Sequence, residues 1–501
     1  MKFMIALLLL GAMTAGPSDE VRLWKDSSGK FSIRAKLVEN RNGVVLLEKE
    51  NGEKINVPLN RLSDEDRKFL RDQTKSRYKP KQSKSKQSPA DSTSGETLDA
   101  SPVSTSWPSW RGADRTGVSR ETGLLQSWPE NGPAELWRAD GLGAGMSSIV
   151  VADDKIFTLG RSSGQQNIVC LSTSGQVLWK SPFAGSAEPN CTPTFDDGLV
   201  YGVGRNGVLA CVRAETGEKV WSVDYSADFG GRMMSQWGFS ESPLVDGELL
   251  ICTPGGSGAM IVALNKKTGK VVWKTPMRDG GSRGKDGAGY SSIVISNAGG
   301  IKQYVTLVGR GVISVEARTG RPLWQYEKVA NGTANVPTPI VSGNYVFCSS
   351  GYNDGGSALL EIQKRGSALG VREVYYYRSN EVQNHHGGMV LIDGHVYMGN
   401  GHNKGFPLCL EMRTGKVKWG GRLRGEGDGS AAIVAADGQI YFRYEDGKMA
   451  LVEANPGAYK VNGSFRLPIR NGKSWPHPVV ADGQLYIRCQ DQIVCFDIKK
   501  K

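Results

Sequence analysis

Four segments of this chain concentrate side chains that could bind or act on a ligand. They combine arginine, histidine, tryptophan and tyrosine with small polar residues, and each leads into a short apolar run that we expect to form a strand. Loops on a rigid scaffold often carry binding and catalytic groups. The candidate residues are Arg232, Gln236, Trp237, Glu241, Arg283, Tyr290, Asn384, His385, His386, Trp475 and His477.

The spacing of these residues matches few kinds of chemistry. His385 and His386 are adjacent, and no carboxylate lies near them at ligand spacing, so no metal site is predicted. No local Ser-His-Asp signature of a hydrolase is present, and glycine-rich pieces such as residues 255–258 do not open a phosphate-binding helix. The histidines therefore either contact a polar ligand or partner, or are ordinary structural side chains.

The composition favours short strands and tight turns as the elements that position these loops. Glycine contributes 65 of 501 residues and tryptophan 12. Glycine in a helix interior costs about 1 kcal/mol, so this composition argues against a helical bundle. The net charge of +12 is spread thinly. The only basic run, residues 75–86, lacks interleaved aromatic residues apart from Tyr78, so no nucleic-acid partner is expected.

Two markers recur from residue 107 onwards. A glycine stands four residues before a tryptophan in five places, and residues 375–378, after Gly370, occupy the place of a degenerate further copy. A hairpin-turn dipeptide such as Asp197-Gly198 recurs eight times, and a period of roughly 40–50 residues with four strands is typical of a β-propeller. The sequence therefore predicts an all-β, eight-bladed propeller over residues 107–501. Pairing residues 134–137 with the last strand would close the ring.

The repeated tryptophan is interpreted as structural. On an outer strand it can bury roughly 150–250 Å² against the next blade. The glycine before it supplies the positive φ that the turn requires. The tryptophans assigned to this docking position are Trp137, Trp179, Trp221, Trp273, Trp324 and Trp419.

All eight cysteines lie beyond residue 169. Several precede the same turn of the repeat, where a small apolar side chain suits a core position. Cys489 and Cys495 fall on one predicted hairpin and are the only pair that we consider for a disulfide.

The N-terminal part divides into three pieces. Residues 1–16 have a basic start, a short apolar run and small residues, which predicts a signal peptide. No lipobox cysteine and no transmembrane anchor is predicted, so we expect a periplasmic or secreted protein. Residues 17–72 contain short strand-like runs and a helix start capped by Ser63. Residues 73–106 are rich in Lys, Ser, Gln, Pro and Thr, and are interpreted as a disordered linker.

Two resemblances follow from these motifs. The Thr-Gly-x-x-x-Trp repeat, with the segments 107–118, 384–388 and 475–478, resembles the PQQ-binding-like propeller repeat family (BamB/quinoprotein-like). The Arg-x-Trp, Gly-x-Phe and Val-Pro-Leu patterns within residues 20–72 resemble the SLA homology domain of type one, which implies an SH3-like barrel. That domain binds proteins in eukaryotic adaptors.

The family contains both enzymes and scaffolds. The quinoprotein dehydrogenases hold PQQ on the propeller axis with a Trp floor, adjacent cysteines, a Ca²⁺ held by Glu, Asn and Asp, and an Asp base. This sequence has no Cys-Cys dipeptide and no Cys-x-x-Cys-His haem site. We therefore expect an exported, non-catalytic scaffold or recognition protein without a cofactor, which binds a protein partner through the SH3-like module and the propeller surface.

Two other functions stay open. One is a PQQ- and Ca²⁺-dependent alcohol or sugar dehydrogenase with a diffusible electron acceptor. The other is a carbohydrate-binding propeller, which is favoured if Trp237 and Trp475 both point into the mouth of the channel.

Overall fold

The computed structural model describes residues 21–26, 32–41, 44–49, 51–58, 61–63, 65–66, 69, 106–277, 281–352, 354–366, 368–469 and 472–501. The chain divides into two compact units, residues 1–104 and 105–501. The predicted signal peptide (1–16) and the predicted linker (73–106), except for Ser106, lie outside the described residues. Within the described part, no helix has the length and apolar composition needed to cross a membrane.

The first unit contains a small antiparallel sheet in the order β1-β2-β3-β4. Its strands are β1 (Val21–Lys25), β2 (Ser32–Arg41), β3 (Val44–Lys49) and β4 (Lys54–Pro58). Trp24 is buried in its core, and its indole donates a hydrogen bond of 3.0 Å to the carbonyl of Ala35. Ser63 caps the backbone N–H of Asp66 at 3.2 Å, as the sequence predicts. This small all-β unit agrees with the predicted SH3-like fold.

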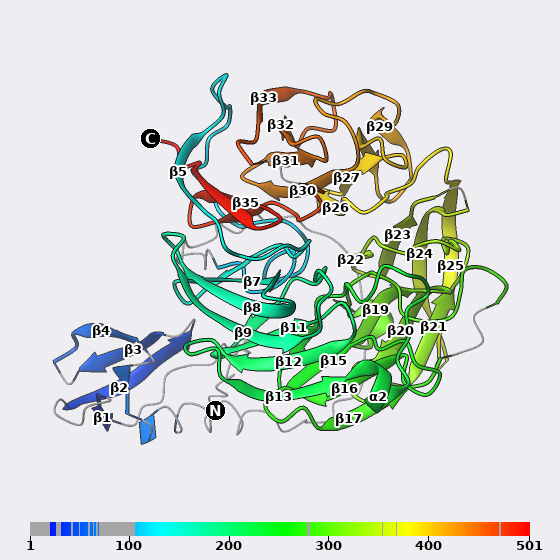
Figure 1. Ribbon diagram of the computed structural model, residues 1–501. Coiled ribbons are helices and arrows are strands. Elements are labelled where there is room, and N and C mark those ends of the chain that lie inside the picture. Colours follow the sequence, from blue (N-terminus) through cyan, green and yellow to red (C-terminus); the bar gives the residue numbers. More distant parts are fainter. Residues whose placement is uncertain are drawn as a thin grey trace, which may run out of the picture. The chain divides into compact units, whose positions relative to one another are not determined.

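The second unit is an eight-bladed β-propeller, which confirms the predicted fold (Figure 1). Each blade is a four-stranded antiparallel sheet whose strands follow one another in the chain. Blades 1 to 4 are formed by β6 (Val150–Ala152), β7 (Lys155–Ser162), β8 (Gln165–Ser172) and β9 (Val177–Ala184); β10 (Thr194–Asp196), β11 (Leu199–Val203), β12 (Val208–Arg213) and β13 (Lys219–Asp224); β14 (Leu244–Asp246), β15 (Leu249–Cys252), β16 (Ile261–Asn265) and β17 (Val271–Thr275); and β18 (Val294–Ser296), β19 (Gln303–Val308), β20 (Gly311–Glu316) and β21 (Pro322–Tyr326).

The remaining blades complete the ring. Blades 5 to 7 are formed by β22 (Ile340–Ser342), β23 (Tyr345–Ser350), β24 (Gly356–Arg365) and β25 (Ala368–Arg378); β26 (Met389–Ile392), β27 (His395–Asn400), β28 (Phe406–Glu411) and β29 (Val417–Gly420); and β30 (Ala431–Ala436), β31 (Gln439–Tyr444), β32 (Lys448–Glu453) and β33 (Val461–Arg466). Blade 8 contains β34 (Val479–Ala481), β35 (Gln484–Cys489), β36 (Gln492–Asp497) and β5 (Ala134–Ala139). The helical pieces are α2 (Tyr225–Phe229), after blade 2, and the 3-10 turn η2 (Ala298–Gly300).

Blade 8 closes the ring by joining the two ends of the propeller. Its outer strand β5 comes from the start of the unit and pairs antiparallel with β36, so that Trp137 lies opposite Cys495. Figure 1 shows β5 beside the C-terminal blade. Because β5 completes the last sheet, the first and last parts of the propeller share one blade, and no blade is left with a missing strand. The structure confirms this predicted pairing.

Tight turns connect the first two strands of most blades. At Asp197-Gly198, Asp393-Gly394 and Asp437-Gly438 both central residues have positive φ, between 46° and 75°. This is the backbone of a type I′ turn, whose twist matches that of the flanking strands. Asp-Gly is therefore repeated because this turn requires residues that tolerate the left-handed conformation.

The outer tryptophans contact the following blade. A Cβ added to Gly320 of blade 4 would lie 2.4 Å from the Trp273 ring of blade 3, so the turn glycine provides the space for the indole. The same arrangement joins Gly175 to Trp137, Gly217 to Trp179 and Gly269 to Trp221. In all eight blades a β-bulge follows the residue that pairs with this outer-strand position.

Blades 5 and 7 use other aromatic residues. Tyr375 takes the predicted degenerate position, and a Cβ on Gly415 of blade 6 would lie 3.1 Å from its ring. Blade 7 has Gly463 in the outer-strand position, opposite Leu451. Trp128, from the segment before β5, approaches there instead: its backbone N–H donates to the carbonyl of Asn462 at 2.9 Å. The sequence repeat gave no indication of this substitution.

The eight cysteines all lie in the described residues, and each is buried and not bonded to another cysteine. Cys489 and Cys495, the pair considered for a disulfide, are therefore both thiols here. Burial raises the pKa of Cys495 to about 12. Cysteine acts in this propeller as a small core residue.

Candidate functional site

A cavity of about 770 Å³ opens among the loops that lead into the first strands of the blades. Seven of the eight blades contribute to its lining, with residues such as Ser148 of blade 1 and Thr192 of blade 2. A cavity lined from so many blades lies on the axis of the ring. Its volume falls in the range of about 300–1,000 Å³ that is common for ligand pockets.

A collar of hydroxyl groups connects the blades beside this cavity. The backbone N–H of Ser148 donates to Thr192 Oγ1 at 3.0 Å, and the N–H of Thr192 donates to Ser242 Oγ at 3.2 Å. The same contact continues from Ser242 to Ser292 and from Ser292 to Thr338. Because each hydroxyl accepts from the blade before it, the collar fixes the spacing of the first strands around blades 1 to 5. Short Ser or Thr motifs before the first strands are the sequence signal for it.

The segment 107–118 crosses beneath the cavity. It begins against blade 1, where Trp107 and Val151 exchange backbone hydrogen bonds of 2.7 and 3.0 Å. It ends against blade 7, where the N–H of Ala435 donates to the carbonyl of Gly117 at 2.8 Å. Blades 1 and 7 lie on either side of blade 8. Between its two ends the segment also contacts blade 6, through Arg111, and blade 3, through Arg115. This segment therefore forms a floor to the cavity, which Trp110 lines.

Two buried arginines fasten this floor. Arg115 donates to the carbonyls of Pro243 at 3.0 Å and Ser242 at 2.5 Å, both in blade 3. Arg111 donates to the carbonyl of Met389 in blade 6. Burial lowers the pKa of each guanidinium to about 10, which still leaves both charged at neutral pH. The positive charges are spread over carbonyl oxygens of two blades that lie three positions apart in the ring.

One wall of the cavity is a cluster of aromatic and imidazole rings. His386 lies with its ring centroid 5.0 Å from that of Trp475, and His385 lies 4.3 Å from both His386 and His402. Tyr352 packs on His402 at 4.7 Å. These rings come from blades 5, 6 and 8. The closed ring places them together although they are up to 123 positions apart in the chain.

Glu445, from the β31–β32 turn of blade 7, orients this wall. Its Oε1 accepts a hydrogen bond of 2.9 Å from the Trp475 indole and lies 3.0 Å from His386 Nε2. Burial raises the pKa of Glu445, but the contacts with His386 and Trp475 outweigh this effect, and the net pKa is lowered. The carboxylate therefore holds both rings in place.

Burial lowers the pKa of three of the cavity histidines, His385, His402 and His477, which favours their neutral form at ordinary pH. Burial, together with the neighbouring His386 and His402, lowers the pKa of His385 to about 2. Burial and the nearby Arg111 lower the pKa of His477 to about 3. The pKa of His402 is lowered by burial in the same way. Each neutral imidazole offers one N–H donor and one nitrogen acceptor.

The opposite wall is built around Trp237. Asn190 Nδ2 donates to the Trp237 carbonyl at 2.9 Å, and the Trp237 N–H donates to the hydroxyl of Tyr290 at 3.3 Å. Lys473 connects this wall to the first, because its ammonium lies 5.6 Å from the Trp237 ring and 4.4 Å from the Trp475 ring. The two indoles therefore border the same part of the cavity.

The structure brings together six of the eleven candidate site residues. These six line the cavity: Trp237, Tyr290, His385, His386, Trp475 and His477. Glu241 and Asn384 are instead buried in the scaffold. Glu241 accepts from the Tyr225 hydroxyl at 3.1 Å, and Asn384 donates to the carbonyls of Gly388 and Gly399 at 3.1 and 3.0 Å.

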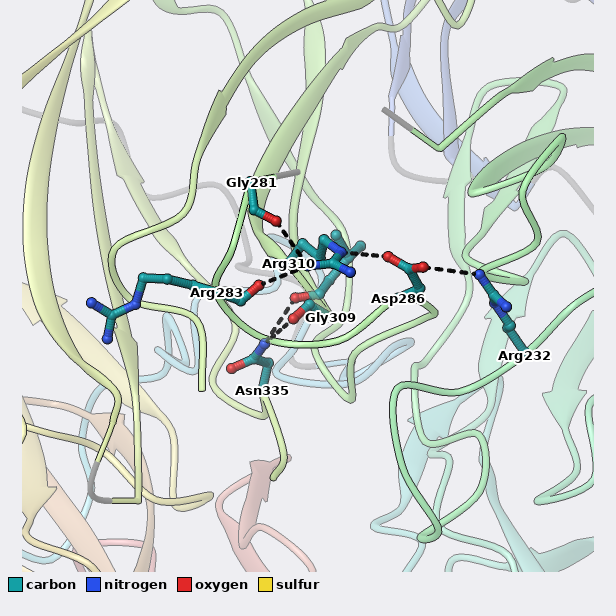
Figure 2. Close-up of polar contacts among 8 residues, drawn as sticks. Arg232, Gly281, Arg283, Asp286, Gly309, Arg310 and Asn335 are labelled. Carbon is teal, nitrogen blue, oxygen red and sulfur yellow. Dashed lines mark hydrogen bonds and ion pairs between the residues drawn. The ribbon is translucent and has the colours of Figure 1, made fainter. Parts of the chain in front are cut away.

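The other three candidates lie away from the lining. Figure 2 shows Asp286 between the guanidinium groups of Arg232 and Arg310, with Arg232 at 3.3 Å. The hydrogen bond from Arg310 lowers the pKa of Asp286. Arg283 donates to the carbonyl of Asp354. Gln236 is exposed and does not line the cavity.

Several lining residues were not singled out from the sequence. They are Trp110, Asn190, Arg205, Tyr352, His402 and Lys473. Trp110 and Lys473 stand in or beside the segments 107–118 and 475–478, so those segments carry a signal. Tyr352 and His402 follow second strands, in loops for which the sequence repeat sets no expectation.

The donor set of the site is poor in metal ligands. Among the described residues, no group of three or more His, Cys, Asp or Glu side chains is arranged to hold a metal ion. Glu188 is the one carboxylate in the lining, and it lies 3.6 Å from Arg161. Mixed amide, hydroxyl, imidazole and indole groups dominate the remaining polar surface.

Comparisons with known proteins agree with this architecture. A family model described as Outer membrane protein assembly factor BamB matches residues 122–228 and 164–421, and a model of SLA1 homology domain 1 matches residues 14–78. A protein named Outer membrane protein assembly factor BamB, from Burkholderia pseudomallei, is 26% identical over 251 residues, which are 48% of this chain and 60% of that protein. The chain thus spans about 60% of the length of this relative.

Solved structures share the fold at low identity. The crystal structure of BamB from Moraxella catarrhalis has a TM-score of 0.53 and 14% identity, and covers 73% of this chain and 100% of that chain. Quinohemoprotein alcohol dehydrogenase from Comamonas testosteroni has a TM-score of 0.57 and 13% identity, over 79% and 81% of the two chains. BamB and an alcohol dehydrogenase share this fold, so fold alone does not assign an activity.

Proposed function

This chain belongs to the β-propeller family described as Outer membrane protein assembly factor BamB, and we propose that it is an exported, non-catalytic scaffold that binds other proteins. The family match over residues 122–421 is the observation that carries this proposal. The relatives of that name are outer membrane protein assembly factors. The leader-like residues 1–16 support a periplasmic or secreted location.

The outer edge of the propeller offers a surface for such a partner. On four consecutive blades, 8, 1, 2 and 3, the residue before the docked tryptophan is an exposed Leu or Val. These residues are Leu136, Leu178, Val220 and Val272, with exposed fractions between 38% and 52%. They lie on β5, β9, β13 and β17, each the last strand of its sheet. An arc of apolar side chains on strand edges is a surface to which an extended partner segment can add.

The test is co-purification of the full-length protein after cross-linking in its native envelope. We expect the double variant Leu178→Lys, Val272→Lys to lose its specific partners. The matched control is Val417→Lys, an exposed valine on β29 of blade 6, outside the arc. Partner recovery that is equal in the two variants would place binding elsewhere, and the absence of any specific partner of the wild type would reject the scaffold function.

The N-terminal unit is proposed as a second protein contact. Its match to SLA1 homology domain 1 supports this role. The full chain and a chain that lacks residues 17–72 but keeps the leader should differ in their cross-linked partners. If both recover the same proteins in the same amounts, this unit does not contribute to partner binding.

The dehydrogenase alternative fits the cavity poorly. A quinone-bound Ca²⁺ would require Glu, Asn and Asp ligands, whereas the lining holds Glu188 as its carboxylate, and Glu188 already lies beside Arg161. None of the eight cysteines, all of them described, lines the cavity. Tight binding of PQQ with Ca²⁺, followed by dye reduction with alcohols, would nevertheless replace the scaffold proposal with this one.

A further inference from the structure

The axial cavity carries an inference of its own, which goes beyond a protein-binding scaffold. Its lining differs from blade to blade, whereas the blades around it repeat. Three tryptophans, two tyrosines and four histidines gather there, together with amides and hydroxyls. The aromatic and imidazole rings belong neither to the docked-tryptophan contacts nor to the hydroxyl collar, which join successive blades.

The aromatic faces are fixed before any ligand arrives. The Trp475 indole is held by Glu445 at 2.9 Å, and the Trp237 backbone is held by Asn190 at 2.9 Å and Tyr290 at 3.3 Å. A flat apolar surface that is already oriented binds a ring-shaped ligand without an added ordering cost. Lys473 lies against both indoles and is exposed, so its flexible ammonium can move aside as a ligand enters.

The polar groups identify the kind of ligand. The lowered pKa values of His385, His402 and His477 favour neutral imidazoles, whose ring nitrogens can donate or accept. One nitrogen of His385 already contacts Ser430 Oγ at 2.8 Å, and one of His402 contacts Asn403 Nδ2 at 3.3 Å, so each of these two rings has one nitrogen left for a ligand. The Nδ1 atoms of His402 and His477 are buried and have no hydrogen-bond partner within the described residues. Asn190, Asn403 and Ser240 add further groups that both donate and accept. Hydroxyl groups of a ligand have the same dual character, so this lining is complementary to several hydroxyls.

The charges argue against a strongly anionic ligand. Arg205 and Lys473 are the cations of the lining, and Glu188 is its carboxylate. Arg111 and Arg115 lie in the floor, but their guanidinium groups are committed to backbone carbonyls of blades 6 and 3. Recognition of phosphate or several carboxylates generally uses clustered, available arginines.

We propose that this cavity binds a neutral oligosaccharide, with sugar rings stacked on Trp475 and Trp237 and their hydroxyls bonded to the histidines and amides of the lining. The aromatic faces contact the C–H faces of the sugar rings. The floor at residues 107–118 limits how deeply the saccharide enters. The cavity has a volume of about 770 Å³, which accommodates more than a single sugar ring.

The test is calorimetric titration of the full-length protein with defined probes. The neutral probes are maltotriose, cellotriose and tri-N-acetylchitotriose; the anionic probes are trigalacturonic acid and PQQ. We expect at least one neutral probe to bind. Trp475→Ala and Trp237→Ala should each weaken it about tenfold, whereas Trp475→Phe, which keeps an aromatic face, should weaken it less. Trp419→Phe, on an outer strand away from the cavity, is the matched control and should bind as the wild type does.

Each other outcome overturns the proposal. Binding of an anionic probe alone assigns the cavity to an anionic ligand, and the absence of binding by all neutral probes rejects a saccharide. Equal binding by wild type, Trp475→Ala and Trp237→Ala places the saccharide outside the cavity. Thermal unfolding of each variant shows whether it is folded. If a tryptophan variant does not fold, the affinity of Lys473→Ala for the neutral probe is measured instead, because Lys473 is exposed and lies against both indoles. An affinity equal to that of the wild type then places the saccharide outside the cavity. Protein cross-linking by the wild type is independent of all these results.

Discussion

The outer edge and the centre of this propeller are built by opposite rules. At the edge, four pairs of successive blades repeat one contact, in which a turn glycine such as Gly320 receives a ring such as Trp273. At the centre, the corresponding loops present Trp237, Tyr290, His385 and Trp475 in different blades. A contact that is repeated at equivalent positions serves the ring as a whole, whereas groups that occur once can select a ligand. The edge should therefore determine stability, and the centre should determine binding.

Removal of a docked tryptophan should have the largest effect on stability. Trp324 is 5% exposed, and its indole donates to Gln303 Oε1 at 2.6 Å. Trp324→Ala should lower the free energy of unfolding by about 3–5 kcal/mol, because it leaves a cavity between blades. Urea-induced unfolding of the full chain measures this loss.

The loss of stability in Trp324→Ala is to be compared with that of Trp475→Ala, the same substitution at the centre of the propeller. Trp475 is only half-buried, and it borders the cavity, where its indole donates to Glu445 of blade 7 at 2.9 Å. Trp475→Ala should cost about 1 kcal/mol. If the two variants lose equal stability, the division of roles between edge and centre is wrong.

The floor of the cavity belongs to neither class, and a variant there should have the next largest effect. Arg115→Ala removes the donor to the Ser242 and Pro243 carbonyls and leaves the buried Glu241 without its nearby positive charge. We expect a loss of about 3 kcal/mol and faster proteolysis within residues 107–118. Arg120→Ala, an exposed arginine paired with Asp114, is the control and should change stability by less than about 0.5 kcal/mol. Unchanged protease sensitivity of the Arg115 variant would mean that the floor does not depend on this arginine.

The turn glycines separate the cost of backbone conformation from the cost of a clash. Gly320 has φ 73°, and an added Cβ would meet the Trp273 ring at 2.4 Å. Gly247 has a similar φ of 62°, but an added Cβ there would meet nothing within 4 Å. Gly247→Ala should cost about 1 kcal/mol, and Gly320→Ala about 2–3 kcal/mol. Equal melting temperatures for the two variants would show that the indole moves away without cost.

The same contrast explains what could be predicted from the sequence. The number of blades, the ring closure through Trp137 and the position of Tyr375 all follow from spacing, because a repeated contact leaves a repeated residue. Trp128 was missed because it reaches blade 7 from a segment outside the repeat. Glu241 and Asn384 precede first strands as the lining residues do, but they point into the scaffold. Spacing along the chain does not determine which way a side chain points.

His386 and Trp475 were predicted as site residues, but their contact through Glu445 was beyond prediction for a related reason. His386, Glu445 and Trp475 meet only because blades 6, 7 and 8 are neighbours in a closed ring. Glu445, in a turn between two strands, was not singled out from the sequence. The shared chemistry of the three residues appears when the loops of different blades are placed around one axis.

The neutral histidines of the centre give the smallest expected effect, a loss of stability in acid. The pKa of His385 is held at about 2 by burial and by His386, and that of His477 at about 3 by burial and by Arg111. Both lie below the value of about 6.5 expected in the unfolded chain. Between these limits the unfolded state binds more protons, so the free energy of unfolding should be level above pH 6.5 and fall below it, by roughly 1 kcal/mol for each histidine at pH 5.5. The melting temperature measured from pH 8 to pH 5 tests this expectation. His385→Gln should make the melting temperature fall less steeply in acid. The control His395→Gln, on a hairpin of blade 6, should leave this fall unchanged. If the His385 variant falls as steeply as the wild type, His385 is not a cause of the loss of stability in acid.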